Sequence, residues 1–141
     1  MNDLAKDKKI VFVADDDADD CLLINDVLID IGLDWEVQFV GDGIELMERL
    51  GNCENLDNRG CRRPPDLIVL DLNMPRKGGR EVLKEISVDS RFNRIPIVVL
   101  TTSEEPRDVS LCKSLGAKMF FTKPSMYADW LARFESLKQL V

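Results

Sequence analysis

The chain has 141 residues, of which 45% are hydrophobic and 32% are charged. This length and mixture fit one globular domain and exclude a wholly disordered chain. The formal net charge of -7 argues against duplex DNA and anionic membranes as direct partners, because both bind a basic surface.

The first predicted unit is a strand followed by a helix. Ile10–Ala14 is a continuous apolar run, typical of a strand buried on both faces. Asp17 can cap a helix over residues 18–31, and Gly32 ends it. Residues 35–39 then alternate apolar and polar side chains, which predicts a second strand at the edge of the sheet.

The second predicted helix is short and precedes a polar segment. Asp42 caps a helix over residues 43–50, and Gly51 ends it. Residues 52–65 contain Gly, Asn, three Arg and a Pro pair, and they are long for a helix–strand connection. We interpret this segment as a surface excursion that either extends the helix or binds a partner, or is a tolerated loop insertion, since long surface loops cost little free energy.

The middle of the chain predicts a third strand, a third helix and a fourth strand. Leu67–Leu70 is a short apolar run, and residues 80–90 have the apolar spacing of a helix. The fourth strand spans residues 95–100. Pro96 lies near its start, where a missing amide costs least.

The last third predicts two more helices around a fifth strand. Pro106 fits the first turn of a helix that Gly116 ends, and residues 117–121 form the strand. Ser125 caps a final helix with a wide apolar face that either packs on the sheet or forms a dimer or partner surface. Its apolar members are Met126, Tyr127, Trp130, Leu131, Phe134, Leu137 and Val141.

Five alternating strand–helix units predict an α/β fold with a doubly wound, five-stranded parallel sheet, since such crossovers are right-handed. We expect the strand order 2-1-3-4-5 of the flavodoxin-like fold, with its ligand site between the first and third strands. We expect one domain over residues 1–141, with a core over about 9–140 and no output domain.

Composition also excludes several kinds of site. The chain has no histidine, so Ser-His-Asp and Cys-His nucleophiles and a histidine phosphodonor are excluded. Its cysteines form no C-x-x-C pair, which disfavours a zinc site and a disulfide framework. They are Cys21 and Cys112, expected in helix packing, and Cys53 and Cys61, expected as exposed thiols. With no apolar run of membrane-spanning length and no signal peptide, the cytoplasm is the expected compartment.

Polar side chains end the predicted strands, and in a parallel sheet these ends share one edge. Asp15 and Asp16 follow the first strand, and Asp71 follows the third. Three close carboxylates repel unless a small divalent cation binds them, and Mg²⁺ (or Mn²⁺) prefers such oxygen ligands. The backbone carbonyl of Asn73 can supply another oxygen.

The same edge offers the parts of a phosphoryl-transfer site. Asp71 could attack a phosphoryl donor, since carboxylates act as covalent nucleophiles. Lys123 would neutralise the phosphoryl oxygens, and Thr101 or Thr102 would donate a hydroxyl. Each residue alone also has an ordinary structural explanation, such as a helix cap or a solvated lysine. Their joint placement on the right strands favours the phosphoryl site.

At these residues the chain resembles a response regulator receiver domain of two-component signalling, and the resemblance covers about residues 9–140. Asp15 and Asp16 match the family's acidic pair, and Asp71 matches the phosphoacceptor in the segment 71–75. Thr101 matches the hydroxyl position, and Lys123 is followed by Pro124 as in the family, where this pair is often joined by a cis peptide bond.

The resemblance implies further roles. Thr101 and Phe120 would form the conformational switch, although Phe120 lacks a tyrosine hydroxyl and could equally be plain core. Asn73 and Ser103 lie where the family tunes autodephosphorylation. Asp17 stands where many relatives have asparagine, and this departure does not disable the site.

The resemblance also implies function and partners. It implies a phosphoacceptor signalling domain, not an enzyme beyond its own phosphorylation and dephosphorylation. The partner would be a sensor histidine kinase or a phosphotransfer protein. The segments 71–75, 80–83 and 99–103 look most like small stand-alone regulators paired with bacterial phytochromes. A homodimer through the fourth helix, fifth strand and fifth helix would be one output surface.

Three other functions fit these residues less well. An aspartate-nucleophile phosphatase needs a second acid two residues after the nucleophile, where this chain has Asn73, and a cap or pocket for which little chain remains. A flavin-binding electron carrier needs a glycine- and hydroxyl-rich loop after its first strand, where this chain has three aspartates that repel phosphate. A degenerate receiver acting as a scaffold has no need of an intact set of acids.

Overall fold

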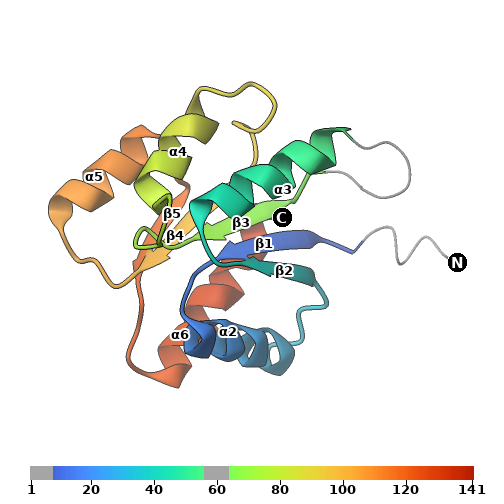
Figure 1. Cartoon of the computed structure of the whole chain (residues 1–141). Helices are drawn as coiled ribbons and strands as arrows, with labels where there is room; N and C mark the ends of the chain where they lie inside the picture. Colours follow the sequence, from blue (N-terminus) through green and yellow to red (C-terminus); the bar gives the residue numbers. More distant parts are fainter. Residues whose placement is uncertain (1–7, 56–63) are drawn as a thin grey trace, which may run out of the picture.

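The computed structural model describes residues 8–55 and 64–141. Its centre is a parallel sheet of five strands in the order β2-β1-β3-β4-β5 (Figure 1). The strands are β1 (Ile10–Ala14), β2 (Glu36–Val40), β3 (Leu67–Leu70), β4 (Ile97–Thr101) and β5 (Met119–Thr122). The predicted fold class and strand order are therefore confirmed, including the edge position of β2.

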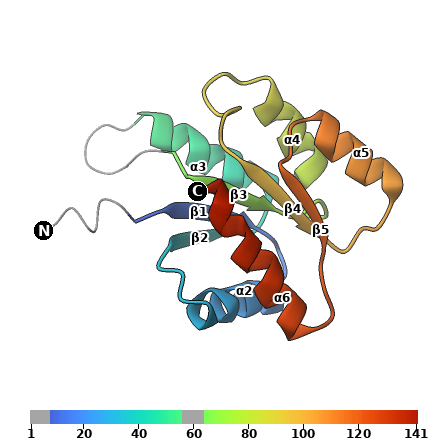
Figure 2. The same ribbon diagram turned by 180° about the vertical axis from the view of Figure 1, so that it is seen from behind.

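Helices cover both faces of the sheet. Figures 1 and 2 show the helices in two groups, one on each face of the sheet. One group is α2 (Ala18–Asp30) and α6 (Tyr127–Ser136), which ends in the 3-10 turn η1 (Leu137–Leu140). The other three are α3 (Gly43–Asn55), α4 (Gly79–Ser87) and α5 (Pro106–Ser114).

The core divides into two apolar layers, one on each side of the sheet. Alternate strand residues face opposite sides, so Phe12 joins the layer under α3, α4 and α5, whereas Val13 joins the layer under α2 and α6. The last helix packs mainly as core, since Trp130 and Phe134 are buried. Met126 at its N-terminal end remains exposed.

Local signals explain both ends of α2 and the start of α3. The Asp17 side chain accepts hydrogen bonds from the amides of Asp19 and Asp20 and caps α2 as predicted. Gly32 follows α2 with a φ of 74°, in the left-handed region that glycine adopts at least cost. The amide of Glu45 donates to the Asp42 carboxylate, which confirms Asp42 as the cap of α3.

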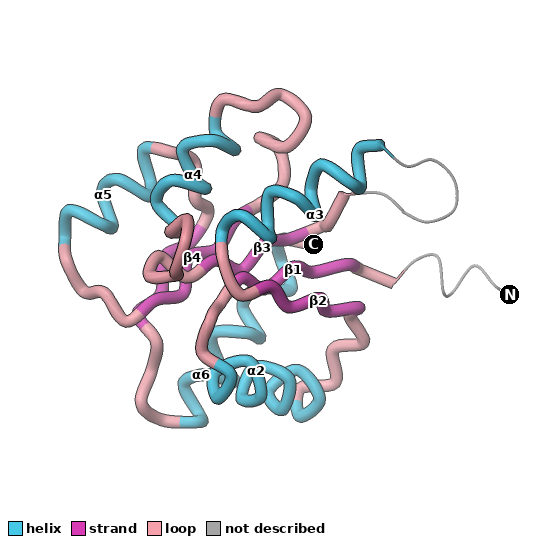
Figure 3. The backbone as a smooth tube through the Cα atoms, in the orientation of Figure 1, coloured by secondary structure: helices cyan, strands magenta, loops and turns pink. Residues whose placement is uncertain are grey.

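The prediction that Gly51 ends the second helix is wrong. α3 continues to Asn55 (Figure 3). Leu46 and Leu50 are fully buried and Cys53 packs against the same layer, so the apolar face continues through the glycine. The expected exposure of Cys53 is therefore also wrong. The rest of the predicted insertion, residues 56–63 with Cys61, lies outside the described residues.

Helices α4 and α6 also differ from prediction. α4 ends at Ser87 and not at residue 90, because the chain turns at Asp89 to bury Phe92. α6 begins after Met126, so Ser125 is not its cap. The predicted strand limits also shift by one or two residues, as β4 and β5 begin later and each ends one residue later. Among the described helices, none has the length and apolar composition needed to cross a membrane.

Candidate functional site

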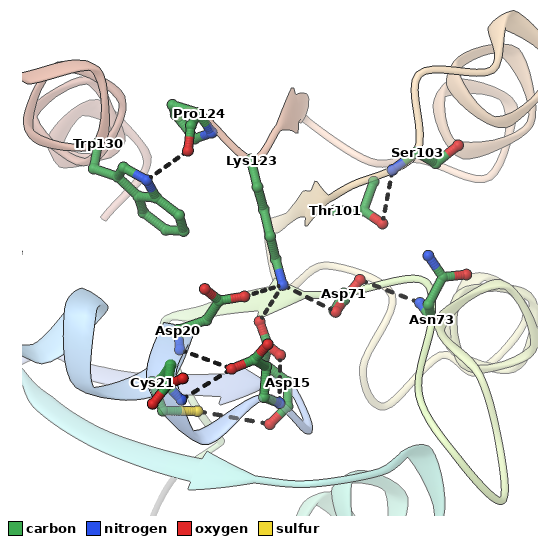
Figure 4. A network of polar contacts seen from close by, with 12 residues as sticks. Asp15, Asp20, Cys21, Asp71, Asn73, Thr101, Ser103, Lys123, Pro124 and Trp130 are labelled. Carbon is green, nitrogen blue, oxygen red and sulfur yellow. Dashed lines mark hydrogen bonds and ion pairs between the residues drawn. The ribbon is translucent and has the colours of Figure 1, made fainter. Parts of the chain in front are cut away.

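The carboxyl ends of four strands bring the predicted site residues together. Backbone hydrogen bonds extend the sheet one residue beyond the ends of its strands. The amides of Asp15, Asp71 and Lys123 donate to the carbonyl oxygens of Val40, Ala14 and Thr101, respectively. These bonds fix the backbone at each site residue. Figure 4 shows Lys123 reaching from the end of β5 towards the acids that follow β1 and β3.

Lys123 is the centre of this site. Its Nζ lies 2.6 Å from Asp20 Oδ2, 2.9 Å from Asp15 Oδ2 and 3.2 Å from Asp71 Oδ2. The lysine side chain is only 8% exposed, and Asp15 and Asp71 are buried as well. A desolvated ammonium held by three carboxylates is a fixed positive charge at the sheet edge.

The acids also form a cluster that fits a divalent cation. Oxygen atoms of Asp15, Asp16 and Asp71 all lie within 4.8 Å of one another. Asp16 is exposed, so the cluster opens to solvent on one side. Hard oxygen ligands with an open side are the donor set that Mg²⁺ and Mn²⁺ prefer, because these ions retain water and bind phosphate oxygens.

Backbone amides hold the cluster in place. The Asp17 amide donates to Asp15 Oδ1 at 2.9 Å, and the Asn73 amide donates to Asp71 Oδ1 at 3.2 Å. Each of these carboxylates therefore uses one oxygen for a backbone amide and the other for Lys123. This division fixes the rotamers of both acids before any ligand binds.

Burial and charge shift two pKa values at this edge. Burial raises the pKa of Asp15, although the Asp17 amide and the Lys123 ammonium oppose that effect. Burial alone would lower the pKa of Lys123, but hydrogen bonds to Asp20 and Asp15 outweigh it, and the pKa lies above its usual value. The ammonium is therefore charged throughout the physiological range.

The predicted hydroxyl lies in the next strand. Thr101 is fully buried at the end of β4, and its Oγ1 accepts a hydrogen bond from the Ser103 amide at 3.4 Å. Ser103 Oγ donates to Asp108 Oδ2 at 2.5 Å, and Asp108 in turn pairs with Arg80 at the start of α4. The segment after β4 is thus anchored to two helices.

The remaining predicted residues lie around this edge. Asn73 is exposed beyond Asp71, and Phe120 is half-buried in β5 against the layer under α3, α4 and α5. None of the peptide bonds in the described ranges is cis, so the expected cis Lys123–Pro124 bond is not found. A trans bond is also the intrinsic preference before proline. Trp130 Nε1 donates to the Pro124 carbonyl oxygen at 2.9 Å.

Sequence reasoning missed two contributors to the site. Asp20 is one of them, and it makes the shortest contact with Lys123. A signal was available, because the third residue of a helix points its side chain back towards the preceding strand end. The Arg80–Asp108 pair was not predicted, since its two residues lie 28 positions apart in the sequence, on different helices.

The family model of the response regulator receiver domain matches residues 11–135 of the chain. The chain belongs to this family. Receiver domains are signalling domains of two-component systems that are phosphorylated on an aspartate and bind a divalent cation. The predictions of the family and of a divalent cation are therefore confirmed.

Similar proteins include regulators linked to phytochromes. The response regulator Rcp1 of Synechocystis sp. is 36% identical to this receiver over 132 residues, which cover 92% of this chain and 86% of Rcp1. A crystal structure of phosphorylated RcpA, a cyanobacterial phytochrome response regulator, has a TM-score of 0.81 at 35% identity, covering 94% of this chain and 92% of RcpA.

Two further structures extend the comparison. The Mn²⁺-bound form of Rcp1 has a TM-score of 0.80 at 34% identity and covers 93% of this receiver and 92% of that chain. A response regulator in red light signalling of R. palustris has a TM-score of 0.83 at 28% identity, and the match covers 94% of this chain and 93% of that chain. The predicted resemblance to stand-alone phytochrome regulators is thus confirmed at the level of similarity.

Proposed function

We propose that Asp71 is the phosphoacceptor of this receiver and that a sensor histidine kinase, or a phosphotransfer protein, supplies the phosphoryl group. The observation that carries the proposal is the position of Asp71, which lies in the acidic cluster and 3.2 Å from the Lys123 ammonium. Asp71 Oδ would attack phosphorus, forming an O–P bond while the P–N bond of the phosphohistidine breaks and its imidazole leaves.

The cation site would be formed by the carboxylates of Asp15, Asp16 and Asp71, with the backbone carbonyl of Asn73 as a further oxygen. A divalent cation there supplies charge neutralisation for the acids and for the incoming phosphoryl oxygens. Lys123 supplies the second positive charge, and its buried ion pairs hold it in place before transfer.

Thr101 and Phe120 would report phosphorylation to the surface. The Thr101 hydroxyl would bond a phosphoryl oxygen, which draws the segment after β4 towards Asp71, and half-buried Phe120 would move into the space left behind. Such a signal shifts a two-state equilibrium and needs no new fold.

Asn73 and Ser103 would set the lifetime of the phosphorylated state by orienting water near Asp71. Asn73 is exposed and close to the acid, which supports this role. Ser103 is committed to Asp108 in this structure, so its hydroxyl would need to be released first.

The similarity to phytochrome regulators supports a bacterial phytochrome as the kinase. The receiver would act in the cytoplasm as a phosphoacceptor, with no enzymatic activity beyond its own phosphorylation and dephosphorylation. A homodimer through α5, β5 and α6 is the output surface that we propose. No direct contact with nucleic acid or membrane is proposed, in keeping with the net charge of -7.

Intact mass spectrometry tests the proposal. The protein is incubated with Mg²⁺ and acetyl phosphate, alongside Asp71→Asn, which keeps the shape of the side chain but removes the nucleophile. One added phosphoryl group on the native chain, absent without Mg²⁺ and absent in the variant, is the expected result. An adduct that persists in Asp71→Asn would contradict it.

A further inference from the structure

Asp20 stands apart from the other acids around Lys123. Of the three carboxylates that contact the ammonium, Asp15 and Asp71 belong to the cluster that fits a divalent cation, and Asp20 does not. It is nevertheless the partner at the shortest distance, 2.6 Å. In Figure 4, Asp20 and Asp71 lie on opposite sides of the Lys123 Nζ atom.

Local structure holds Asp20 in this position. It is the third residue of α2, and its backbone amide donates to the capping Asp17 carboxylate at 3.2 Å. Because Cα–Cβ bonds tilt towards the start of a helix, its side chain points back to the end of β1. The Asp20 side chain is 22% exposed, so the pair with Lys123 is only partly screened by solvent.

The two kinds of partner have opposite consequences for cation binding. An ammonium that pairs with Asp15 and Asp71 occupies oxygens of two of the three carboxylates in the acidic cluster, so it competes with a divalent cation for these carboxylates. An ammonium that pairs with Asp20 does not compete. In the structure the ammonium contacts all three acids. We propose that Asp20 is a positioning residue that gives the Lys123 ammonium a partner outside the cation site, so that a divalent cation displaces the ammonium from Asp15 and Asp71 more easily.

The inference rests on the proposed function, in which Lys123 and a divalent cation act together on one phosphoryl group. Without Asp20, Lys123 would keep only the two partners that lie in the cluster. The ammonium would then bind Asp15 and Asp71 more tightly, and a divalent cation would displace it less easily.

Mn²⁺ binding, followed by the electron paramagnetic resonance signal of the free ion, tests this directly. The variants are Asp20→Asn and, as a matched control, Asp19→Asn, which removes the same charge from the exposed neighbouring residue of the same helical turn. Both are made in the native chain and in Lys123→Gln, after native circular dichroism has been verified for each variant.

In the native chain, Asp20→Asn should weaken Mn²⁺ binding about three- to ten-fold more than Asp19→Asn, the range expected for directly coupled residues. In Lys123→Gln, the two substitutions should have equal effects, because the competitor is gone. Equal effects in the native chain would overturn the proposal. A difference that persists in Lys123→Gln would also overturn it, since Asp20 would then act on the cation without Lys123.

Two further readouts separate positioning from a general structural role. The ¹⁵N resonance of the Lys123 ammonium should shift in Asp20→Asn and stay unchanged in Asp19→Asn. With acetyl phosphate as donor, Asp20→Asn should raise the half-saturating Mg²⁺ concentration more than Asp19→Asn does. If the native chain forms no adduct, the proposed function fails, whereas Mn²⁺ binding and the ammonium resonance still decide the role of Asp20.

Discussion

Arg80 and Asp108 join α4 to α5 through two parallel hydrogen bonds, from Nε at 2.9 Å and from the terminal nitrogen at 2.7 Å. Asp108 also accepts the Ser103 hydroxyl, so one carboxylate links both helices to the segment that follows Thr101. Hydrogen bonds to Arg80 and Ser103 lower the pKa of Asp108 to about 2. A bidentate guanidinium–carboxylate pair is among the stronger arrangements of charged side chains.

Asp108→Asn should therefore lower the free energy of unfolding by about 1 kcal/mol at neutral pH, a value reduced for the partial exposure of Arg80. The pKa of this carboxyl is lower in the folded state than in the unfolded state, where it is about 3.9. Its ionised form therefore stabilises the folded protein at pH values above about 3.9, and this stabilisation is lost as the pH falls towards about 2. Urea unfolding between about pH 5 and pH 2 should show the difference between native and variant shrinking. Glu104→Gln, an exposed acid in the same segment, should show no such trend.

Two glycines should respond to alanine in opposite directions. A methyl group at Gly79 would overlap the Asp71 carbonyl oxygen and lie 2.8 Å from the Leu72 Cα atom, both backbone atoms beside the site. Gly79→Ala should lower the free energy of unfolding by about 1–3 kcal/mol. A methyl at Gly51 meets no atom within 4 Å, and Gly51→Ala should stabilise the helix by about 0.5–1 kcal/mol. Thermal unfolding checks both, and a stabilised Gly79→Ala would contradict the packing at α4.

Lys123→Gln should destabilise the protein by about 3 kcal/mol without divalent cations, because buried Asp15 and Asp71 lose their ammonium partner. Mg²⁺ should recover more stability in this variant than in the native chain, since the cation binds only the folded state and meets no competing ammonium. Urea midpoints with and without Mg²⁺ measure both effects. Lys113→Gln, on the exposed face of α5, serves as the control.

Asp16→Asn should weaken Mn²⁺ binding at least about ten-fold while leaving the free energy of unfolding within about 0.5 kcal/mol of the native value. Asp16 is exposed, so its substitution leaves no buried group without a partner. Calorimetric titration with Mn²⁺ and urea unfolding together test this separation. Unchanged Mn²⁺ affinity would remove Asp16 from the cation site.

The strands were predictable because each depends on a short-range pattern, and their order followed from the doubly wound arrangement expected of five strand–helix units. β1, β3 and β4 are buried on both faces, and a continuous run of apolar residues is the signature of that environment. The convergence of Asp15, Asp71, Thr101 and Lys123 then follows from the parallel order alone, since their positions are set by strand ends and not by side-chain packing.

The features that escaped prediction depend on contacts between distant residues. Gly51 does not end α3, because buried Leu50 and the packing of Cys53 favour continuing the helix over the intrinsic cost of glycine. Ser125 does not cap α6, because the helix begins at Tyr127 with Met126 in the cap position. Trp130, in the first turns of this helix, donates a hydrogen bond to the Pro124 carbonyl oxygen. Asp20 could be placed in a helix from the sequence, but its partner lies 103 residues away.

The hydrogen bond from the Trp130 indole to the Pro124 carbonyl gives this receiver its own optical reporter. Pro124 follows Lys123 directly, so any displacement of the lysine backbone changes the polarity around a buried indole. The only other tryptophan, Trp35, packs beside β2 in the same apolar layer. With Trp35→Phe, Trp130 would be the single tryptophan, and its fluorescence emission would report binding at the acidic cluster in real time, with no attached dye.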